Sequence, residues 1–282
     1  MAAYPNSPFL VETEWLASNT GKPDIRVVEV DEDPTAYKSG HIPGAIPWHW
    51  RDDLHDPLRR DFIDAQGLRD LLMRSGVGDD TTIILYGGNN NWFAAYAYWY
   101  LKYQGFNNVK LLNGGRQRWE RESRPMTAER PAVTPAPMAP RLAGPRPELR
   151  ALRDEVLAKQ GSGQITFIDV RSPEEYRGEL LAPAHLPQEQ AQVPGHIPGA
   201  RNIPWSKAAD QDGTFRSPDE LKELYAASGA AADRPIVAYC RIGERSSHTW
   251  FVLHELLGYQ NVKNYDGSWT EYGSLVGVPV ER

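Results

Sequence analysis

The stretch YKSGHIPGAIPW, residues 37–48, returns in the second half of the chain as QVPGHIPGARNIPW, residues 192–205. Both copies contain the run Gly-His-Ile-Pro-Gly-Ala. Two further pairs of similar stretches align without a gap at an offset of 153 residues: 81–88 aligns with 234–241, and 101–115 aligns within 253–268. Solenoid repeats recur every 20 to 50 residues or so, and a repeat at this longer distance indicates a duplicated domain. We therefore expect one fold used twice.

The composition is that of a folded protein without a nucleic-acid or membrane partner. The 282 residues suffice for two domains of ordinary size, and the formal net charge is −6. No basic run alternates with aromatic residues, no leader with a positive and then an apolar segment opens the chain, and no run of about 18 apolar residues occurs. The single cysteine cannot form an internal disulfide, and no residue spacing resembles a zinc site. We expect a cytoplasmic protein that holds no metal.

Each half alternates predicted strands and helices. Short apolar, β-branched runs predict three strands in each half: 25–30, 82–87 and 109–112, then 165–170, 235–239 and 262–265. Between the last two strands of the second half we expect a helix that begins near Ser246 and Ser247, a good N-cap pair, and ends at Gly258. Strand–helix–strand at this spacing predicts an α/β fold with a parallel β-sheet flanked by helices in each domain.

The two domains are expected at residues 8–128 and 148–282. The stretch between them, 129–147, carries six prolines and few periodic apolar residues, which is typical of a semi-extended linker. The second half also contains about 16 extra residues at 178–193. This insertion could be a lid with His185 near the substrate, or a plain surface insertion.

Cys240 directly follows a predicted strand and precedes a predicted helix. Ligands of parallel sheets bind beyond the carboxyl ends of the strands, so the position suits a functional residue. A helix N-terminus and neighbouring arginines stabilise a thiolate, and Gly243 allows consecutive N–H groups to turn toward an anion. A lone cysteine is more often an inert buried residue, but this placement beside Arg241 and Arg245 favours a reactive thiol.

Three motifs in order resemble the tandem-domain rhodaneses, the thiosulfate and 3-mercaptopyruvate sulfurtransferases, along nearly the whole chain. They are Tyr37-x3-His41-Ile-Pro-Gly-Ala, the Cys240 loop, and VKNYDGSWTEY at 262–272. The resemblance implies two tandem rhodanese-like domains and the transfer of a sulfur atom in two steps. Cys240 takes the outer sulfur of a donor as a persulfide and passes it to cyanide or to a thiol or dithiol acceptor. It implies no metal or organic cofactor.

The active loop favours thiosulfate as the small anionic donor. We expect Arg241, Arg245 and Arg171 to bind it. Mercaptopyruvate enzymes of the family usually carry small, neutral residues after the cysteine, so Arg241 favours thiosulfate and leaves 3-mercaptopyruvate as the alternative donor. Glu175 stands where vertebrate-type members tend to have a substrate-contacting arginine. The other residues of the expected active-site loop are Ile242, Gly243, Glu244, which could pair with a loop arginine, and Ser246.

Two other functions share part of this pattern. Cysteine phosphatases need Cys-x5-Arg to seat a phosphate, whereas four residues separate Cys240 from Arg245. Non-catalytic rhodanese-like modules commonly lack the cysteine, which is present here. The first half has Gly87 at the corresponding position, followed by GNNNWF, so we expect that domain to be catalytically inactive and to support the second.

Residues kept in both copies are expected to be architectural, because only one copy has a thiol. This applies to His41 and His196 in the repeated turn, and to Glu29 and Asp169 at the ends of corresponding strands. Three other residues are expected to be structural or solvated: Trp205, Trp269 and Arg177.

Overall fold

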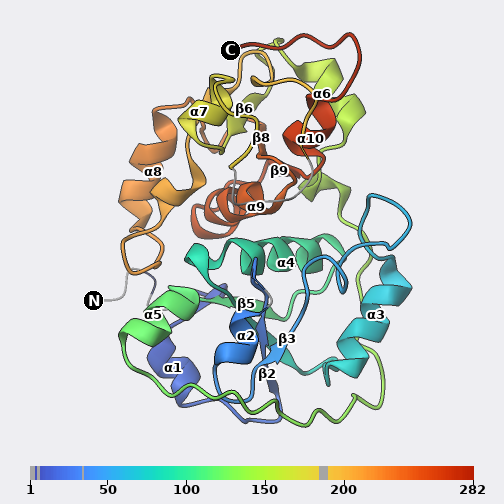
Figure 1. Cartoon of the computed structure of the whole chain (residues 1–282), viewed down its shortest axis with the longest axis vertical. Helices are drawn as coiled ribbons and strands as arrows, with labels where there is room; N and C mark the ends of the chain where they lie inside the picture. Colours follow the sequence, from blue (N-terminus) through green and yellow to red (C-terminus); the bar gives the residue numbers. More distant parts are fainter. Residues whose placement is uncertain (1–3, 5–6, 34, 184–189) are drawn as a thin grey trace. The chain divides into compact units, whose positions relative to one another are not determined.

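The structure is a computed structural model that describes residue 4 and residues 7–33, 35–183 and 190–282. It divides into two compact units, each with its own sheet and helices (Figure 1). The first unit comprises Met1–Arg146 and Ala209–Phe215, and the second comprises Pro147–Ala208 and Arg216–Arg282.

The first unit is built on a five-stranded parallel sheet in the order β1-β5-β4-β2-β3. Its strands are β1 (Leu10–Val11), β2 (Ile25–Glu29), β3 (Ile46–Pro47), β4 (Thr82–Tyr86) and β5 (Val109–Leu112). Its helices are α1 (Thr13–Ala17), α2 (Ala36–Ser39), α3 (Ala65–Arg74), η1 (Asn89–Asn91), α4 (Trp92–Tyr103) and α5 (Gly115–Arg121). The three strands predicted for this half are confirmed to within one residue.

The second unit repeats this plan with a four-stranded parallel sheet in the order β7-β6-β8-β9. Its strands are β6 (Thr166–Asp169), β7 (Arg201–Asn202), β8 (Ile236–Tyr239) and β9 (Val262–Tyr265). Its α-helices are α6 (Arg153–Lys159), α7 (Pro173–Tyr176), α8 (Pro218–Ala226), α9 (Glu244–Trp250) and α10 (Ser268–Tyr272). Shorter turns are η2 (Pro147–Leu149) and η3 (Trp205–Ala208), and a π-helical segment, η4 (Phe251–Leu256), continues α9. The predicted α/β fold with a parallel sheet in each domain is confirmed.

Strand β8 is buried along its whole length, between β6 and β9. Its residues Val237 and Tyr239 pack in the core with Phe167 and Trp269. A parallel strand that is covered on both faces needs an uninterrupted apolar run, which explains the sequence IVAY. The residue that follows this strand is therefore held on a rigid base.

Helix α7 begins with a capping box that fixes one glutamate. The Ser172 hydroxyl accepts the N–H of Glu175, and the Glu175 carboxylate accepts the N–H of Ser172 at 3.0 Å. Pro173 favours the first helical position because its missing N–H is not needed there. The local sequence of α7 therefore fixes the position of Glu175 without contacts from distant parts of the chain.

The proline-rich stretch packs on the first unit up to Arg146. It contains no helix or strand over residues 129–146, but the N–H groups of Ala136 and Arg146 donate to the carbonyls of Met73 and Tyr103. The domain bounds 8–128 and 148–282 stay predictions. The helices formed by the described residues include none long and apolar enough to cross a bilayer.

Candidate active site

Cys240 is the first residue after β8, and its side chain is fully buried. Helix α9 begins at Glu244, so the expectation that it begins near Ser246 and Ser247 is wrong. The reason is Gly243, whose left-handed φ of 105° turns the chain directly into the helix. Both serines lie in the first helical turn, and their hydroxyls donate to the Gly243 carbonyl at 3.1 and 2.8 Å.

The loop folds around the sulfur. The N–H of Gly243 donates to Cys240 Sγ at 3.1 Å, and the hydroxyls of Ser246 and Ser268 lie 3.6 and 3.9 Å from it. A Cβ at Gly243 would lie 2.8 Å from the Cα of Asp266, so this close approach requires glycine. The Gly243 N–H held in this way stabilises an anionic sulfur.

Ser268 ties helix α10 to the cysteine. Its φ is +52°, a left-handed conformation that is uncommon for a residue with a side chain. Its hydroxyl accepts the N–H of Cys240 at 3.0 Å and donates to the Tyr265 carbonyl at 2.7 Å, while the N–H of Trp269 donates to the Cys240 carbonyl at 3.0 Å. These bonds over-determine the conformation. The motif VKNYDGSW indicated the region, but nothing in the sequence singled out this hydroxyl.

Arg245 forms a buried ion pair with Glu175. Two guanidinium nitrogens donate to the two carboxylate oxygens at 2.8 and 3.0 Å. Burial alone would raise the pKa of the Glu175 carboxyl, but Arg245 outweighs it and the pKa is lowered. Burial would also lower the pKa of Arg245, and the same carboxylate raises it instead. Donor binding by Arg245 stays a prediction; the geometry gives it a structural partner.

Arg241 and Ile242 complete the loop between the thiol and Gly243. Arg241 is buried, and burial lowers the pKa of its guanidinium. Ile242 is partly exposed, unlike the two residues that precede it. Arg241 is therefore a buried cation directly beside the thiol.

Glu244 faces the sulfur as well. Its side chain is only 2% exposed, and its Oε2 lies 3.7 Å from Cys240 Sγ. Burial raises the pKa of the Glu244 carboxyl, against the opposing effect of Arg245 and Arg241. The sequence indicated a negative charge in the loop but not that it would contact the thiol.

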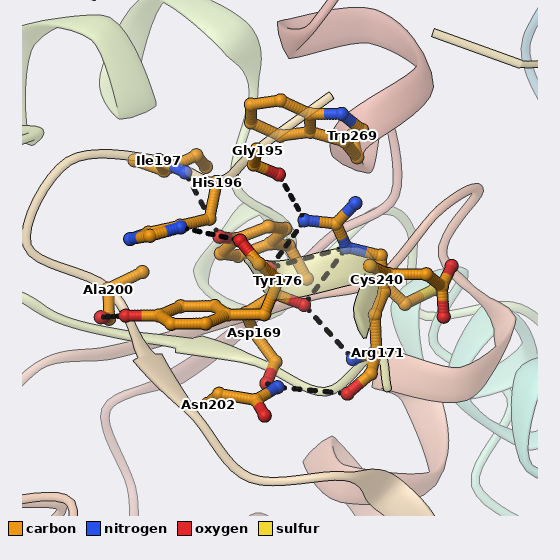
Figure 2. Close-up of polar contacts among 12 residues, drawn as sticks. Asp169, Arg171, Tyr176, Gly195, His196, Ile197, Ala200, Asn202, Cys240 and Trp269 are labelled. Carbon is orange, nitrogen blue, oxygen red and sulfur yellow. Dashed lines mark hydrogen bonds and ion pairs between the residues drawn. The ribbon is translucent and has the colours of Figure 1, made fainter. Parts of the chain in front are cut away.

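Arg171 lies in a separate buried network with Asp169 (Figure 2). Its Nε and Nη2 donate to the Asp169 carboxylate at 3.0 and 2.6 Å, and Nη2 also donates to the Gly195 carbonyl at 2.7 Å. The guanidinium stacks over Trp269 at 4.9 Å from the ring centroid. This arrangement supports an architectural role for Asp169 and Trp269, and donor binding by Arg171 stays a prediction.

The Rhodanese-like domain family matches the chain twice, over residues 12–122 and 152–275. The chain belongs to this family.

Known rhodanese-like proteins resemble this one over nearly its whole length. A protein of Mycolicibacterium smegmatis named "Putative thiosulfate sulfurtransferase" is 59% identical over 275 residues, 98% of each chain. The sulfur carrier protein TtuD of Thermus thermophilus is 52% identical and covers 99% of this chain and 98% of its own. The crystal structure of SseA from Escherichia coli, a 3-mercaptopyruvate sulfotransferase, superposes with a TM-score of 0.76 at 26% identity, covering 93% and 98% of the two chains.

The first rhodanese-like domain has no room for a thiol at the corresponding position. A Cβ at Gly87 would lie 2.2 Å from the Val30 carbonyl oxygen. The Asn91 side chain accepts the N–H of Gly87 at 2.9 Å and donates to the Leu112 carbonyl at 2.6 Å. Asn91 thus fills the space of the loop with backbone contacts, which supports the proposal that this domain is inactive.

The repeated histidines hold the same turn in both rhodanese-like domains. The Nδ1 atoms of His41 and His196 lie 2.9 and 2.8 Å from the carbonyls of Tyr37 and Tyr176, and each imidazole stacks on its tyrosine ring at 3.7 Å (Figure 2 shows the second pair). The hydrogen-bonded turn expected of these histidines is confirmed, which supports an architectural role.

Four other sequence expectations concern residues around the site. Trp205 is 9% exposed and packs edge-on against His248. Arg177 is on the surface and donates to Glu179 at 2.7 Å. His185 lies outside the described residues, so the lid role of 178–193 stays a prediction. No group of three or more His, Cys, Asp and Glu suited to a metal ion occurs among the residues the structure describes.

Proposed function

We propose that this protein is a thiosulfate sulfurtransferase that works through a persulfide on Cys240. The observation that carries the proposal is the cysteine at the carboxyl end of β8, with the Gly243 N–H donating to its sulfur at 3.1 Å. The name of the Mycolicibacterium smegmatis relative supports the same activity. A lone reduced thiol also suits the cytoplasm, where we propose that the protein acts.

The geometry supports a transfer in two steps. The Cys240 thiolate attacks the outer sulfur of thiosulfate, the S–S bond of the donor breaks, and sulfite leaves with the bonding electrons. Cyanide or a thiolate then attacks the outer sulfur of the persulfide and releases the Cys240 thiolate. The Gly243 N–H, which donates to Sγ at 3.1 Å, stabilises the sulfur anion before and after each step.

Donor choice rests on Arg241. A buried cation beside the thiol favours a dianion whose charge lies close to the transferred sulfur. The Escherichia coli relative is a 3-mercaptopyruvate sulfotransferase, so 3-mercaptopyruvate is the alternative donor. The Thermus relative is a sulfur carrier, which favours a thiol or a protein as the acceptor in the cell.

The geometry of the loop does not support a cysteine phosphatase. The arginine that would hold a phosphate, Arg245, already donates to both oxygens of Glu175. The loop from Cys240 to Gly243 is also closed tightly enough for a backbone N–H to reach the sulfur.

Mass spectrometry of the intact protein tests the proposal. Incubation with thiosulfate should add one sulfur atom, about 32 Da, and cyanide should remove it, because Cys240 is the only thiol in the chain. The Cys240→Ser variant should show neither the gain nor turnover. Turnover of thiosulfate by that variant, or hydrolysis of an aryl phosphate in place of sulfur transfer, would refute it.

A further inference from the structure

The carboxyl group of Glu244 is buried together with the thiol of Cys240. Glu244 is the first residue of α9, four positions after the cysteine, and the left-handed turn at Gly243 lies between them. Its Oε2 is 3.7 Å from Sγ, and the two side chains are 2% and 0% exposed. Two buried groups at this distance cannot both carry a negative charge without strong repulsion.

Comparison of the two domains shows that the side chain at position 244 has a different partner from its counterpart in the first domain. Asn91 occupies the corresponding place in the first domain, where its side chain binds the N–H of Gly87 at 2.9 Å. In the second domain the corresponding N–H, that of Cys240, is bound by the hydroxyl of Ser268 at 3.0 Å. The side chain at 244 is thus relieved of that backbone contact, and it faces the sulfur instead.

We propose that Glu244 is a catalytic residue that shares one proton with Cys240 and takes it when the thiol becomes the nucleophile. The inference rests on the sulfurtransferase function proposed above. It adds a resident base to a loop whose other groups only stabilise the anion.

The proton balances over a cycle with cyanide as the acceptor. The Cys240 thiol passes its proton to the Glu244 carboxylate, and the thiolate attacks thiosulfate to give a persulfide anion and sulfite. Glu244 then protonates the outer sulfur. Cyanide attacks that sulfur, the S–S bond breaks toward Cys240, and thiocyanate leaves as its proton returns to the pair of side chains. No oxidant or reductant is required, and the pair ends with the proton it began with.

The charges around Glu244 suit this exchange. Arg241 from the loop and Arg245 from α9 face it, and Glu175 from α7 engages Arg245. Burial raises the pKa of Glu244 in spite of both arginines, which brings a carboxylic acid closer to the pH at which a thiol ionises. The two positive charges of these arginines balance the negative charge of Glu175 and the single negative charge that the pair carries.

The pH dependence of kcat/KM for thiosulfate distinguishes two roles of Glu244: a base that accepts the thiol proton, or a carboxylate that only repels the thiolate. Glu244→Gln keeps the shape of the side chain but cannot take a proton, and Glu244→Asp keeps the acid on a shorter stem. If Glu244 accepts the proton, its replacement by Gln should move the acid limb of the profile to higher pH and lower kcat/KM near pH 6 by about a hundredfold, with partial recovery in Glu244→Asp. Glu155→Gln is the matched control, because that carboxylate pairs with Lys263 at 2.9 Å away from the loop.

The opposite shift would overturn the inference. A carboxylate that only repels the thiolate would, when removed, move the acid limb to lower pH and raise kcat/KM. A second measurement needs no variant: the rate of Cys240 alkylation by iodoacetamide in the unaltered protein should rise in two steps with pH, because two coupled groups titrate. A single step would refute the shared proton. Failure of thiosulfate to add a sulfur atom to the unaltered protein would instead refute the proposed function, while the alkylation profile would still report on the pair.

Discussion

Glu175 and Arg245 are joined by two parallel hydrogen bonds, at 2.8 and 3.0 Å, with both side chains almost completely buried. The capping box of α7 fixes the carboxylate, and the first turn of α9 fixes the guanidinium. Arg245, which is expected to bind the donor, is thereby held by Glu175, at a position where vertebrate-type members of the family tend to have a substrate-contacting arginine. The pair links the start of the catalytic helix to a second element of the same domain.

Breaking this pair should cost much of the stability of the second domain. Arg245→Met leaves the Glu175 carboxylate buried without its partner, and we expect a loss of about 3–5 kcal/mol in the free energy of unfolding. Adding Glu175→Gln should recover part of that loss, because no unpaired charge remains. Arg177→Met, which removes an exposed arginine paired with Glu179, is the control and should cost less than about 1 kcal/mol. Urea denaturation measures all three, and equal losses for Arg245→Met and the double variant would contradict the role of the pair.

The same pair should make stability depend on pH in the acid range. The folded-state pKa of Glu175 lies below its ordinary value of 4.5, so its stabilising contribution is present above that pH. It should be lost as the pH falls below it and the carboxylate takes up a proton. The difference in free energy of unfolding between the unaltered protein and Arg245→Met should therefore shrink toward about pH 3. A difference that stayed constant from neutral pH to that value would show that Glu175 does not supply it.

Gly87→Cys should not create a second active site. A Cβ there would lie 2.2 Å from the backbone carbonyl of Val30, which cannot move as the end of a flexible side chain can. We expect a loss of about 2–4 kcal/mol in stability and no second persulfide after incubation with thiosulfate. Gly78→Cys is the matched control in the same domain, because nothing lies within 4 Å of a Cβ at that position. Two sulfur atoms gained per chain in Gly87→Cys would contradict this prediction.

The sequence predicted the architecture well, because architecture depends on local patterns. The apolar runs that became β4 and β8 are buried on both faces, so their composition alone identifies them. The start of α9 was predicted two to three residues too late. The serines resemble an N-cap pair, but the left-handed turn at Gly243 begins the helix before them.

The partners of the loop residues could not be predicted, because they come from distant parts of the chain. Glu175 precedes Arg245 by 70 residues, and Ser268 follows Cys240 by 28. Motif spacing indicates that these residues belong to one domain, but only the packing of α7 and α10 against the end of β8 decides which atoms meet. The contact of Glu244 with the sulfur could not be predicted from helical spacing, because Cys240 lies before α9 and the turn at Gly243 brings the two side chains together.

Ser268 should tolerate glycine better than alanine. Its φ of +52° matches the +54° of Gly115, the corresponding residue of the first domain, so glycine removes the strain together with the hydroxyl. Alanine keeps the strained conformation and leaves the N–H of Cys240 without its acceptor. We expect Ser268→Ala to be less stable than Ser268→Gly by about 1 kcal/mol, and both to form the persulfide more slowly. Thermal unfolding and the time course of the mass gain measure these effects; an alanine variant as stable as the glycine variant would argue against strain at this position.

Arg241→Gly should separate the two possible donors. Arg241 is buried beside the thiol, and the charge of thiosulfate lies on the group bonded to the transferred sulfur, whereas the carboxylate of 3-mercaptopyruvate lies farther from its sulfur. Loss of the cation should cost about 1.5–3 kcal/mol, or roughly ten- to a hundredfold in kcat/KM for thiosulfate, and should leave 3-mercaptopyruvate unchanged or improved. Arg241→Lys, which keeps the positive charge without the planar guanidinium, is the control and should retain part of the preference for thiosulfate. Steady-state kinetics with both donors on the same preparations tests this. Equal losses for the two donors in Arg241→Gly would mean that this arginine supports the loop as a whole, and the preference for thiosulfate would lose its main physical support.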